Sequence, residues 1–144
     1  MKPVPVSHQH ELQPILNLLK ASQLPFQDIT LTKSLIIGYY DQAGKLVGSG
    51  GLEYYQDYAL LRSLAVDASE RGKSIGNYIV DDLLKRAKEK PVSAIFLLTE
   101  TAKAFFEKRN FQNIDRGLVP DVVKESTEFK TVCPASAACM VYRF

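Results

Sequence analysis

Residues 60–76 read LLRSLAVDASERGKSIG, and this stretch decides the fold. It begins as an apolar strand that ends near Val66, continues as a short polar loop and enters an amphipathic helix near Ile75. The first N–H groups of a helix have no partner within it, and the helix dipole adds partial positive charge at that end. Arg71 and Lys73 place two cations beside these N–H groups. The stretch therefore predicts a binding site for a phosphorylated ligand.

The segments around the loop predict a strand–helix–strand unit. Apolar residues recur at helical spacing at Ile75, Ile79, Leu83 and Ala87, and Pro91 ends that helix. Residues 92–98 then form a nearly continuous apolar run, which is typical of a strand buried on both faces. Two strands joined by a helix in this way are parallel, with a right-handed crossover.

Two known nucleotide-binding motifs fit the loop only in part. The dinucleotide pattern GxGxxG is not present. Gly72-Lys73-Ser74 supplies half of a P-loop motif, but Asp67 stands where the first glycine belongs. Glu70 adds a second acid inside the cradle that would have to hold phosphate oxygens. A P-loop nucleoside triphosphatase is therefore an alternative that the charges disfavour.

The loop instead resembles the acyl-CoA loop of the GNAT superfamily of N-acetyltransferases, whose pattern is [Q/R]-x-x-G-x-[G/A] after an apolar strand. Arg71 and Gly76 match it, and Ser74 replaces the middle glycine. We expect this replacement to be mild, because serine is small and suits a helix N-terminus. Residues 102–111 resemble the family's A-x-x-x-[YF]-E-K-x-G-F segment, with Asn110 in the place of the glycine. Asparagine tolerates the left-handed conformation at a helix end better than other non-glycine residues do.

The resemblance extends over residues 34–116 and implies acetyl-CoA as the acyl donor, with no metal. It implies that backbone N–H groups of residues 64–66 hold the thioester and the pantetheine arm, and that residues 71–76 hold the pyrophosphate. Thr99 would add a hydroxyl contact, and Phe106 stands where the family often has a tyrosine that acts as general acid. The expected cofactor-binding residues are Leu64, Ala65, Val66, Arg71, Gly72, Lys73, Ser74, Ile75, Gly76, Thr99 and Phe106.

Arg62 and Glu53 are the candidate catalytic residues. In a regular strand Arg62 shares a face with Leu60, Leu64 and Val66, and a buried guanidinium needs an anionic partner. That partner is either a carboxylate of the acceptor substrate, held by two hydrogen bonds, or a structural salt bridge with a residue such as Glu53. Glu53 is also the candidate base that deprotonates the acceptor ammonium through a water molecule, or else a solvent-exposed hairpin residue.

The rest of the sequence predicts further strands and helices around this unit. The expected elements are a strand over Val4–Val6, a helix capped by Ser7, strands over Ser34–Tyr40, Leu46–Tyr54 and Tyr58–Val66, a helix from Pro120 and a strand over Ala137–Phe144. The predicted fold class is α/β (mixed α+β), with a GNAT-like central mixed sheet. In it, antiparallel N-terminal strands precede the parallel βαβ acyl-CoA unit, and helices cover both faces.

The composition predicts one domain over residues 1–144, with a cytoplasmic location. Hydrophobic residues make up 46% of the chain and charged ones 24%, which is typical of a globular protein. A net charge of +2 argues against a nucleic-acid partner. No apolar run is long enough to cross a membrane, and the first residues are too few and too polar for a signal peptide.

The C-terminal region, with Cys133 and Cys139, adds a second resemblance. Two thiols without further ligands do not form a metal site, so we expect both cysteines to pack in the core. The region resembles a subgroup of short GNAT proteins that includes arsenic-resistance-associated N-acetyltransferases and is similar to the acetyltransferase domain of amino-acid N-acetyltransferases. It implies a small, amino-acid-like amine as acceptor, carrying a carboxylate if Arg62 clasps one, and homodimers are common in the family. A protein N-acetyltransferase and a non-catalytic acyl-CoA-binding module are the alternatives.

Overall fold

The structure, a computed structural model, describes residues 1–31, 34–132 and 136–144, with residues 131 and 132 described by their backbone alone. The strands are β1 (Lys2–Pro5), β2 (Ser34–Tyr40), β3 (Leu46–Tyr55), β4 (Tyr58–Val66), β5 (Ala94–Thr99), β6 (Gln112–Asn113) and β7 (Ala138–Arg143). The helices are α1 (Gln9–Ala21), α2 (Ile75–Glu89), α3 (Lys103–Lys108) and α4 (Asp121–Lys124). A 3₁₀ turn, η1 (Ala68–Glu70), precedes α2, and a π-helical turn, η3 (Glu128–Val132), precedes β7.

The strands form one sheet in the order β1-β2-β3-β4-β5-β7-β6. Within it β4 and β5 are parallel, and the other neighbouring pairs are antiparallel. The predicted mixed sheet with its parallel strand–helix–strand unit is therefore confirmed. No helix in the described ranges combines the length and the apolar character needed to cross a membrane.

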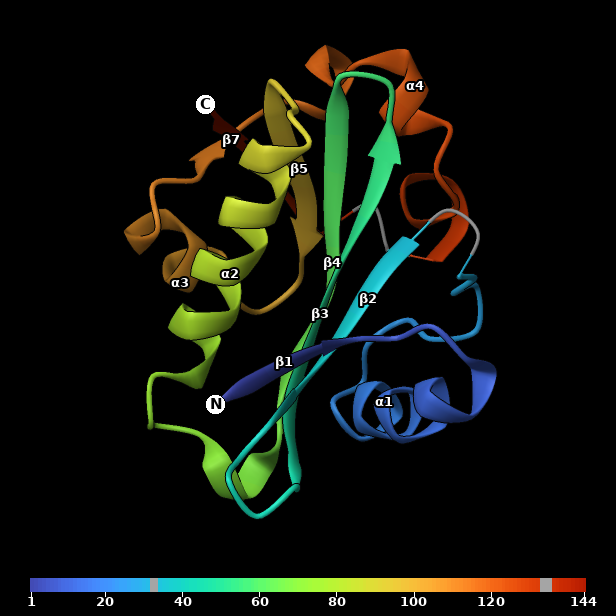
Figure 1. Cartoon of the computed structure of the whole chain (residues 1–144). Coiled ribbons are helices and arrows are strands. Elements are labelled where there is room, and N and C mark those ends of the chain that lie inside the picture. The colour runs from blue at the N-terminus through green and yellow to red at the C-terminus, as the bar shows by residue number, and fades with distance from the viewer. Residues whose placement is uncertain (32–33, 133–135) are drawn as a thin grey trace.

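Helices cover both faces of the sheet (Figure 1). Adjacent residues of a strand point to opposite faces, and Ile36 and Ile37 belong to different hydrophobic clusters for this reason. Ile36 packs in the α1 cluster, whereas Ile37 packs with α2 residues such as Ile79. Helix α2 lies very close to β3, since a Cβ on Gly48 would come 2.7 Å from Ile79 Cδ1.

The N-terminal helix begins one residue later than predicted. His8, not Ser7, is the residue that precedes α1. Ser7 instead donates from its backbone N–H and its hydroxyl to the carboxylate of Glu11 (3.1 Å each). The same carboxylate also accepts from His8 N (2.9 Å), so Glu11 satisfies two N–H groups at this end of the helix.

A bulge in β4 places the functional site. Gly51 is opposite Arg62 and Ser49 is opposite Ala65, so β4 has one residue more than β3 between these pairs. Ser63 lies in this interval with a φ of 62°, in the left-handed region. Pairing of β4 with β5 ends at Leu60 and Phe96, although both strands continue beyond those residues. The two strands therefore separate and leave a gap in the sheet.

The bulge also corrects the predicted face of Arg62. Ala65 packs in the α1 cluster, whereas Leu64 and Val66 pack with the α2 cluster. One extra residue shifts the alternation by one position, so Leu64 and Val66 do not share a face with Arg62 as a regular strand would require. The prediction of a common face was wrong, because it assumed a regular strand through Ser63.

Candidate functional site

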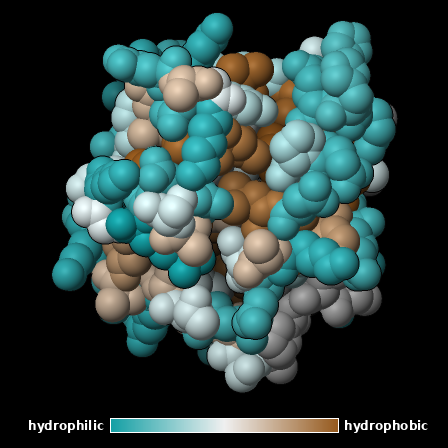
Figure 2. All heavy atoms as spheres, turned by 90° about the horizontal axis from the view of Figure 1, so that it is seen from below, coloured by the Kyte–Doolittle hydropathy of each residue, from teal (hydrophilic) through white to brown (hydrophobic). Residues whose placement is uncertain are grey.

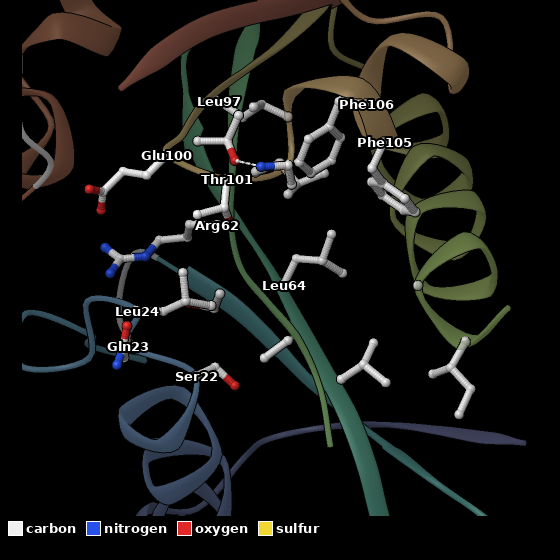
Figure 3. A pocket seen from close by; sticks show the side chains of 18 of the residues that line it. Ser22, Gln23, Leu24, Arg62, Leu64, Leu97, Glu100, Thr101, Phe105 and Phe106 are labelled. Atoms are coloured by element: carbon white, nitrogen blue, oxygen red, sulfur yellow. Dashed lines mark hydrogen bonds between the residues drawn. The ribbon is translucent and has the colours of Figure 1, made fainter. Parts of the chain in front are cut away.

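A cavity of about 620 Å³ occupies the gap between β4 and β5. Seen from below, the molecule has a hollow with hydrophobic residues in its depth and hydrophilic side chains around it (Figure 2). The wall is formed by the end of α1 and the residues after it, β4 from Leu61 onward, the loop before α2, the end of β5, and α3. In the close-up, Arg62 and Glu100 lie on one side of the cavity and Phe105 and Phe106 on the other (Figure 3).

The loop before α2 presents backbone N–H groups at the cavity. The first hydrogen bond of α2 runs from Tyr78 N to Ser74 O (3.2 Å), so the N–H groups of residues 75–77 have no acceptor within the helix. The Ser74 side chain makes no capping hydrogen bond. This helix end therefore combines free N–H groups with the positive end of the helix dipole, which favours an anion.

Two residues in left-handed backbone conformations shape this loop. Gly72 has a φ of 84° and Ser74 a φ of 62°. The expectation that serine replaces the family's middle glycine at little cost was wrong for the backbone. The left-handed conformation disfavours any residue with a Cβ, and Ser74 gains no capping bond in return.

The predicted pyrophosphate residues line the cavity, with Lys73 as the exception. Arg71, Gly72, Ser74, Ile75 and Gly76 contribute to its wall. The Lys73 ammonium lies 3.1 Å from the Glu70 carboxylate and is mostly exposed. The loop therefore offers Arg71, rather than both basic residues, to a ligand in the cavity.

Residues 64–66 of β4, which the resemblance assigns to the thioester and the pantetheine arm, also lie in the cavity wall. Asp67 N donates to Val47 O of the β3 side (2.9 Å). Because N–H groups of successive strand residues point to opposite edges, Val66 N–H and Leu64 N–H face the gap where β5 has separated. These two N–H groups can serve carbonyl oxygens of an extended ligand placed between the strands.

The far wall is aromatic and comes from the segment after β5. Thr99 Oγ1 accepts a hydrogen bond from Ala102 N (3.0 Å), drawn as a dashed line in Figure 3, and both residues line the cavity. Phe106 is buried and packs edge-on against Phe105, with ring centroids 5.1 Å apart. Asn110 has the left-handed conformation expected for it, with a φ of 71°.

Arg62 is bound by carboxylates of the protein itself. Its guanidinium makes two hydrogen bonds with Asp28, from Nη1 to Oδ2 (2.5 Å) and from Nη2 to Oδ1 (2.8 Å). Nη1 also donates to Glu53 Oε2 (3.2 Å), which is the salt bridge considered as an alternative from the sequence. Only 1% of the Arg62 side chain is exposed. A substrate carboxylate could take the same two donors only if Asp28 moved away.

Glu53 lies behind Arg62, and the cavity wall does not include it. Besides Arg62, its carboxylate accepts hydrogen bonds from Ser34 Oγ (3.1 Å) and Tyr55 Oη (2.9 Å). It is 6% exposed, so it is not a solvent-exposed hairpin residue. Burial, the hydrogen bond to Glu53 and its charge raise the pKa of the Tyr55 phenol, which therefore stays a neutral donor.

Three acidic or polar residues of the site were not predicted from the sequence. Asp28 lies in an irregular connection, where no periodic pattern marks a residue as functional. Glu128 lines the cavity and is 5% exposed. Ser63 is a polar residue in an apolar run, and its buried hydroxyl has no hydrogen-bond partner in the described part of the chain. That polar residue was a signal the sequence carried.

Of the two cysteines, the structure describes only Cys139, which is not part of the cavity wall. Cys133 lies outside the described residues, together with residues 134 and 135. Cys139 is a free, buried thiol, and burial raises its pKa to about 11. Within the described ranges no cluster of three or more His, Cys, Asp or Glu side chains is arranged to hold a metal ion.

A family model and the curated relatives of this chain both point to acetyltransferases. The family model described as "Acetyltransferase (GNAT) family" matches residues 7–111. An amino-acid acetyltransferase of Mycobacterium tuberculosis is 37% identical over 76 residues, which is 52% of this chain and 43% of that protein. The three curated relatives compared are matched over 21–62% of their own length, less than two thirds in each case.

Solved structures share the fold over the whole chain. The Mycobacterium tuberculosis protein Rv2747, crystallised with CoA, has a TM-score of 0.74 at 23% identity, covering 98% of this chain and 99% of that one. N-acetylglutamate synthase from Neisseria gonorrhoeae, crystallised with CoA and N-acetyl-glutamate, has a TM-score of 0.76 at 16% identity, covering 99% of this chain and 35% of that one. At these identities the likeness concerns the fold, while the family model covers most of the sequence. The chain belongs to the GNAT acetyltransferase family.

Proposed function

We propose that this protein is an acetyl-CoA-dependent N-acetyltransferase that acts on the amine of a small, amino-acid-like acceptor. One observation carries the proposal: β4 and β5 separate beside the N-terminus of α2, so strand and helix N–H groups face a single cavity. The cytoplasmic location and the homodimer expected from the sequence belong to the same proposal.

The residues present fit coenzyme A in its acetylated form. Arg71 and the N–H groups of residues 75–77 would hold the pyrophosphate, because both favour negative charge. The N–H groups of Leu64 and Val66 would hold the pantetheine arm between the strands. An N–H group directed at the thioester oxygen stabilises the charge that develops there when an amine attacks.

Acyl transfer also needs a neutral amine and a leaving group. An α-ammonium has a pKa near 8, so a carboxylate that removes its proton speeds the reaction. Glu53 remains the proposed base, acting through a water molecule past Arg62, with Arg62 as the residue that positions it. A general acid at Phe106 is not required, since a thiol with a pKa of about 8.5 leaves readily as a thiolate.

The comparisons support both substrates without identifying the acceptor. Relatives named amino-acid acetyltransferase favour a small amine, and related folds were crystallised with CoA. A protein N-acetyltransferase would need a groove wide enough for a peptide chain. A non-catalytic acyl-CoA-binding module would bind the donor and release no thiol.

Two measurements test the proposal. Calorimetric titration should show saturable binding of CoA and acetyl-CoA, and a thiol-release assay should show turnover with at least one small amine. Gly76→Val should weaken CoA binding about tenfold or more, because a Cβ there already comes 3.3 Å from the Phe105 ring. Tyr78→Val, on the same helical turn but outside the cavity wall, is the matched control and should bind normally. Folded protein that binds neither form of CoA would exclude the proposal, and binding without turnover would favour the non-catalytic module.

A further inference from the structure

The hydrogen bonds of Arg62 are nearly all used within the protein. A guanidinium has five N–H donors. Asp28 takes one donor from each Nη atom, Glu53 takes the second from Nη1, and the Pro25 carbonyl oxygen lies 3.5 Å from Nη2. Nε is buried and has no partner among the described residues. The one donor left over is this buried Nε, so Arg62 as it stands offers no pair of donors to a ligand carboxylate.

In the described part of the chain three carboxylates act on the guanidinium of Arg62 at this end of the cavity, those of Asp28, Glu53 and Glu128. Burial alone would lower the pKa of Arg62, but the hydrogen bond with Asp28 and the charges of the three carboxylates outweigh it and raise that pKa. Burial also opposes ionisation of Asp28, and its pKa is nevertheless lowered by the hydrogen bond and charge of Arg62. Both partners therefore stay charged.

The cluster lies where the acceptor amine would bind. Arg62 is four residues before Val66, about 13 Å along the strand from the end of β4, and the loop that would hold the pyrophosphate follows that end. Leu24 and Pro25 complete the wall beside it, next to the segment that carries Asp28. Figure 3 shows Arg62 with Leu24 and Gln23 on the side of the cavity opposite α3.

We propose that Asp28 selects acceptors by their charge. Because it is bound to Arg62, it excludes acceptors that bring a free carboxylate to this end of the cavity. The acceptors favoured are amines whose carboxyl group is amide-linked or absent. This inference rests on the proposed function and names its substrate class. It also reverses the expectation that Arg62 clasps a substrate carboxylate.

The physical reason is a competition for one guanidinium. An incoming carboxylate can displace Asp28 from Arg62, which leaves the partly buried Asp28 carboxylate without its partner. Otherwise it must bind beside Asp28, and the two negative charges repel each other. An acceptor ammonium meets no such obstacle, because the surrounding carboxylates attract it. An amide group carries no charge, so it is not repelled by Asp28 and does not have to displace it from Arg62.

The test compares matched pairs of acceptors at saturating acetyl-CoA. The pairs are glycine with glycinamide and L-alanine with L-alaninamide, and the quantity measured is the amide-to-acid ratio of kcat/KM. An amide neighbour lowers the pKa of the amine in the wild type and the variant alike, so that effect cancels when ratios are compared. Wild type should prefer the amide in both pairs. Asp28→Asn, which keeps the shape and removes the charge, should lower the ratio at least tenfold in favour of the acid.

A control and a measurement on the wild type complete the test. Glu100→Gln removes a carboxylate on the same side of the cavity wall that is not one of the acceptors of Arg62, and it should change the ratio less than threefold. On wild-type enzyme, N-acetylglycinamide should be a product inhibitor at least fivefold stronger than N-acetylglycine. This measurement does not depend on a variant that folds. Preference of wild type for the acids, equal inhibition by the two products, or an unchanged ratio in folded Asp28→Asn would overturn the inference. Turnover with any amine alongside such results would leave the proposed function intact.

Discussion

Replacing Ser74 with glycine should stabilise the protein. Ser74 has φ and ψ of 62° and 21°, and its exposed side chain makes no capping hydrogen bond. A residue with a Cβ in this region costs about 1–2 kcal/mol relative to glycine. Glycine has more conformational freedom in the unfolded chain, which offsets about 0.4–1 kcal/mol of the strain that is relieved. Because no contact is lost, Ser74→Gly should raise the free energy of unfolding by about 1 kcal/mol.

Gly72→Ala is the mirror experiment in the same loop. Gly72 has a φ of 84°, and a Cβ built on it meets nothing within 4 Å. Space is therefore available, and only backbone strain acts, so the variant should lose about 1 kcal/mol. Gly44, with a φ of 82° and equally open surroundings, lies in the turn between β2 and β3 and is not part of the cavity wall. Gly44→Ala should show the same loss without any effect on CoA binding.

Urea unfolding of the free protein measures these differences. Ser74→Gly should move the midpoint to higher urea and Gly72→Ala to lower urea, with unchanged slopes. Thermal midpoints should shift by about 2–5 °C in the same directions. If Ser74→Gly destabilised the protein while Gly72→Ala had no effect, the left-handed conformations would be wrong. The N–H arrangement proposed to hold the pyrophosphate would then lose its basis.

Further expected outcomes concern charge and burial. The pKa of Asp28 is lowered in the folded protein, so its stabilising effect should be constant above about pH 5 and vanish as the pH falls through the folded-state pKa. The difference between wild type and Asp28→Asn in the free energy of unfolding, measured with urea, should therefore shrink below about pH 4. Equal differences at pH 3 and pH 7 would contradict this. Arg71→Ala should weaken CoA binding about five- to tenfold, less at high salt, whereas Lys73→Ala should change it less than about twofold, because Lys73 lies outside the cavity wall. Equal losses in calorimetry would show that both residues bind the ligand. In a Cys133→Ser background, Cys139 should react with a thiol reagent at pH 8 only after unfolding, since a pKa of about 11 leaves about one thiol in a thousand ionised. Rapid labelling of folded protein would refute its burial.

Local patterns were enough to predict the elements of the cofactor half. The i, i+4 spacing from Ile75 to Ala87 and the stop at Pro91 located α2, and the apolar run after it located β5 to within two residues. These features depend on neighbours within one or two turns of the chain, so they are legible in the sequence. The left-handed conformation at Asn110 was predictable for the same reason, because residue type and position at a helix end decide it.

The acceptor half depends on contacts that no local pattern carries. Asp28 and Arg62 are 34 residues apart, and Asp28 sits in a connection without periodicity. The need of Arg62 for a carboxylate follows from its place in an apolar strand, and Glu53 is one partner that the sequence suggests. The sequence could not decide between a substrate and a second protein carboxylate, because both satisfy the guanidinium equally well.

The bulge at Ser63 links the two halves of the site. Before it, Arg62 points to the face covered by α1, where the segment after that helix brings Asp28 within hydrogen-bond distance. After it, the alternation is shifted by one residue, so Leu64 and Val66 pack toward α2. A regular strand would turn Arg62, Leu64 and Val66 to one face and bring the charged cluster against the apolar packing of α2. The single extra residue keeps the carboxylates bonded to Arg62 on one side of the cavity. The apolar wall that bears the N–H groups of Leu64 and Val66 lies on the other side. Acceptor charge and cofactor binding can therefore be altered by separate substitutions, as the Asp28 and Arg71 variants are designed to show.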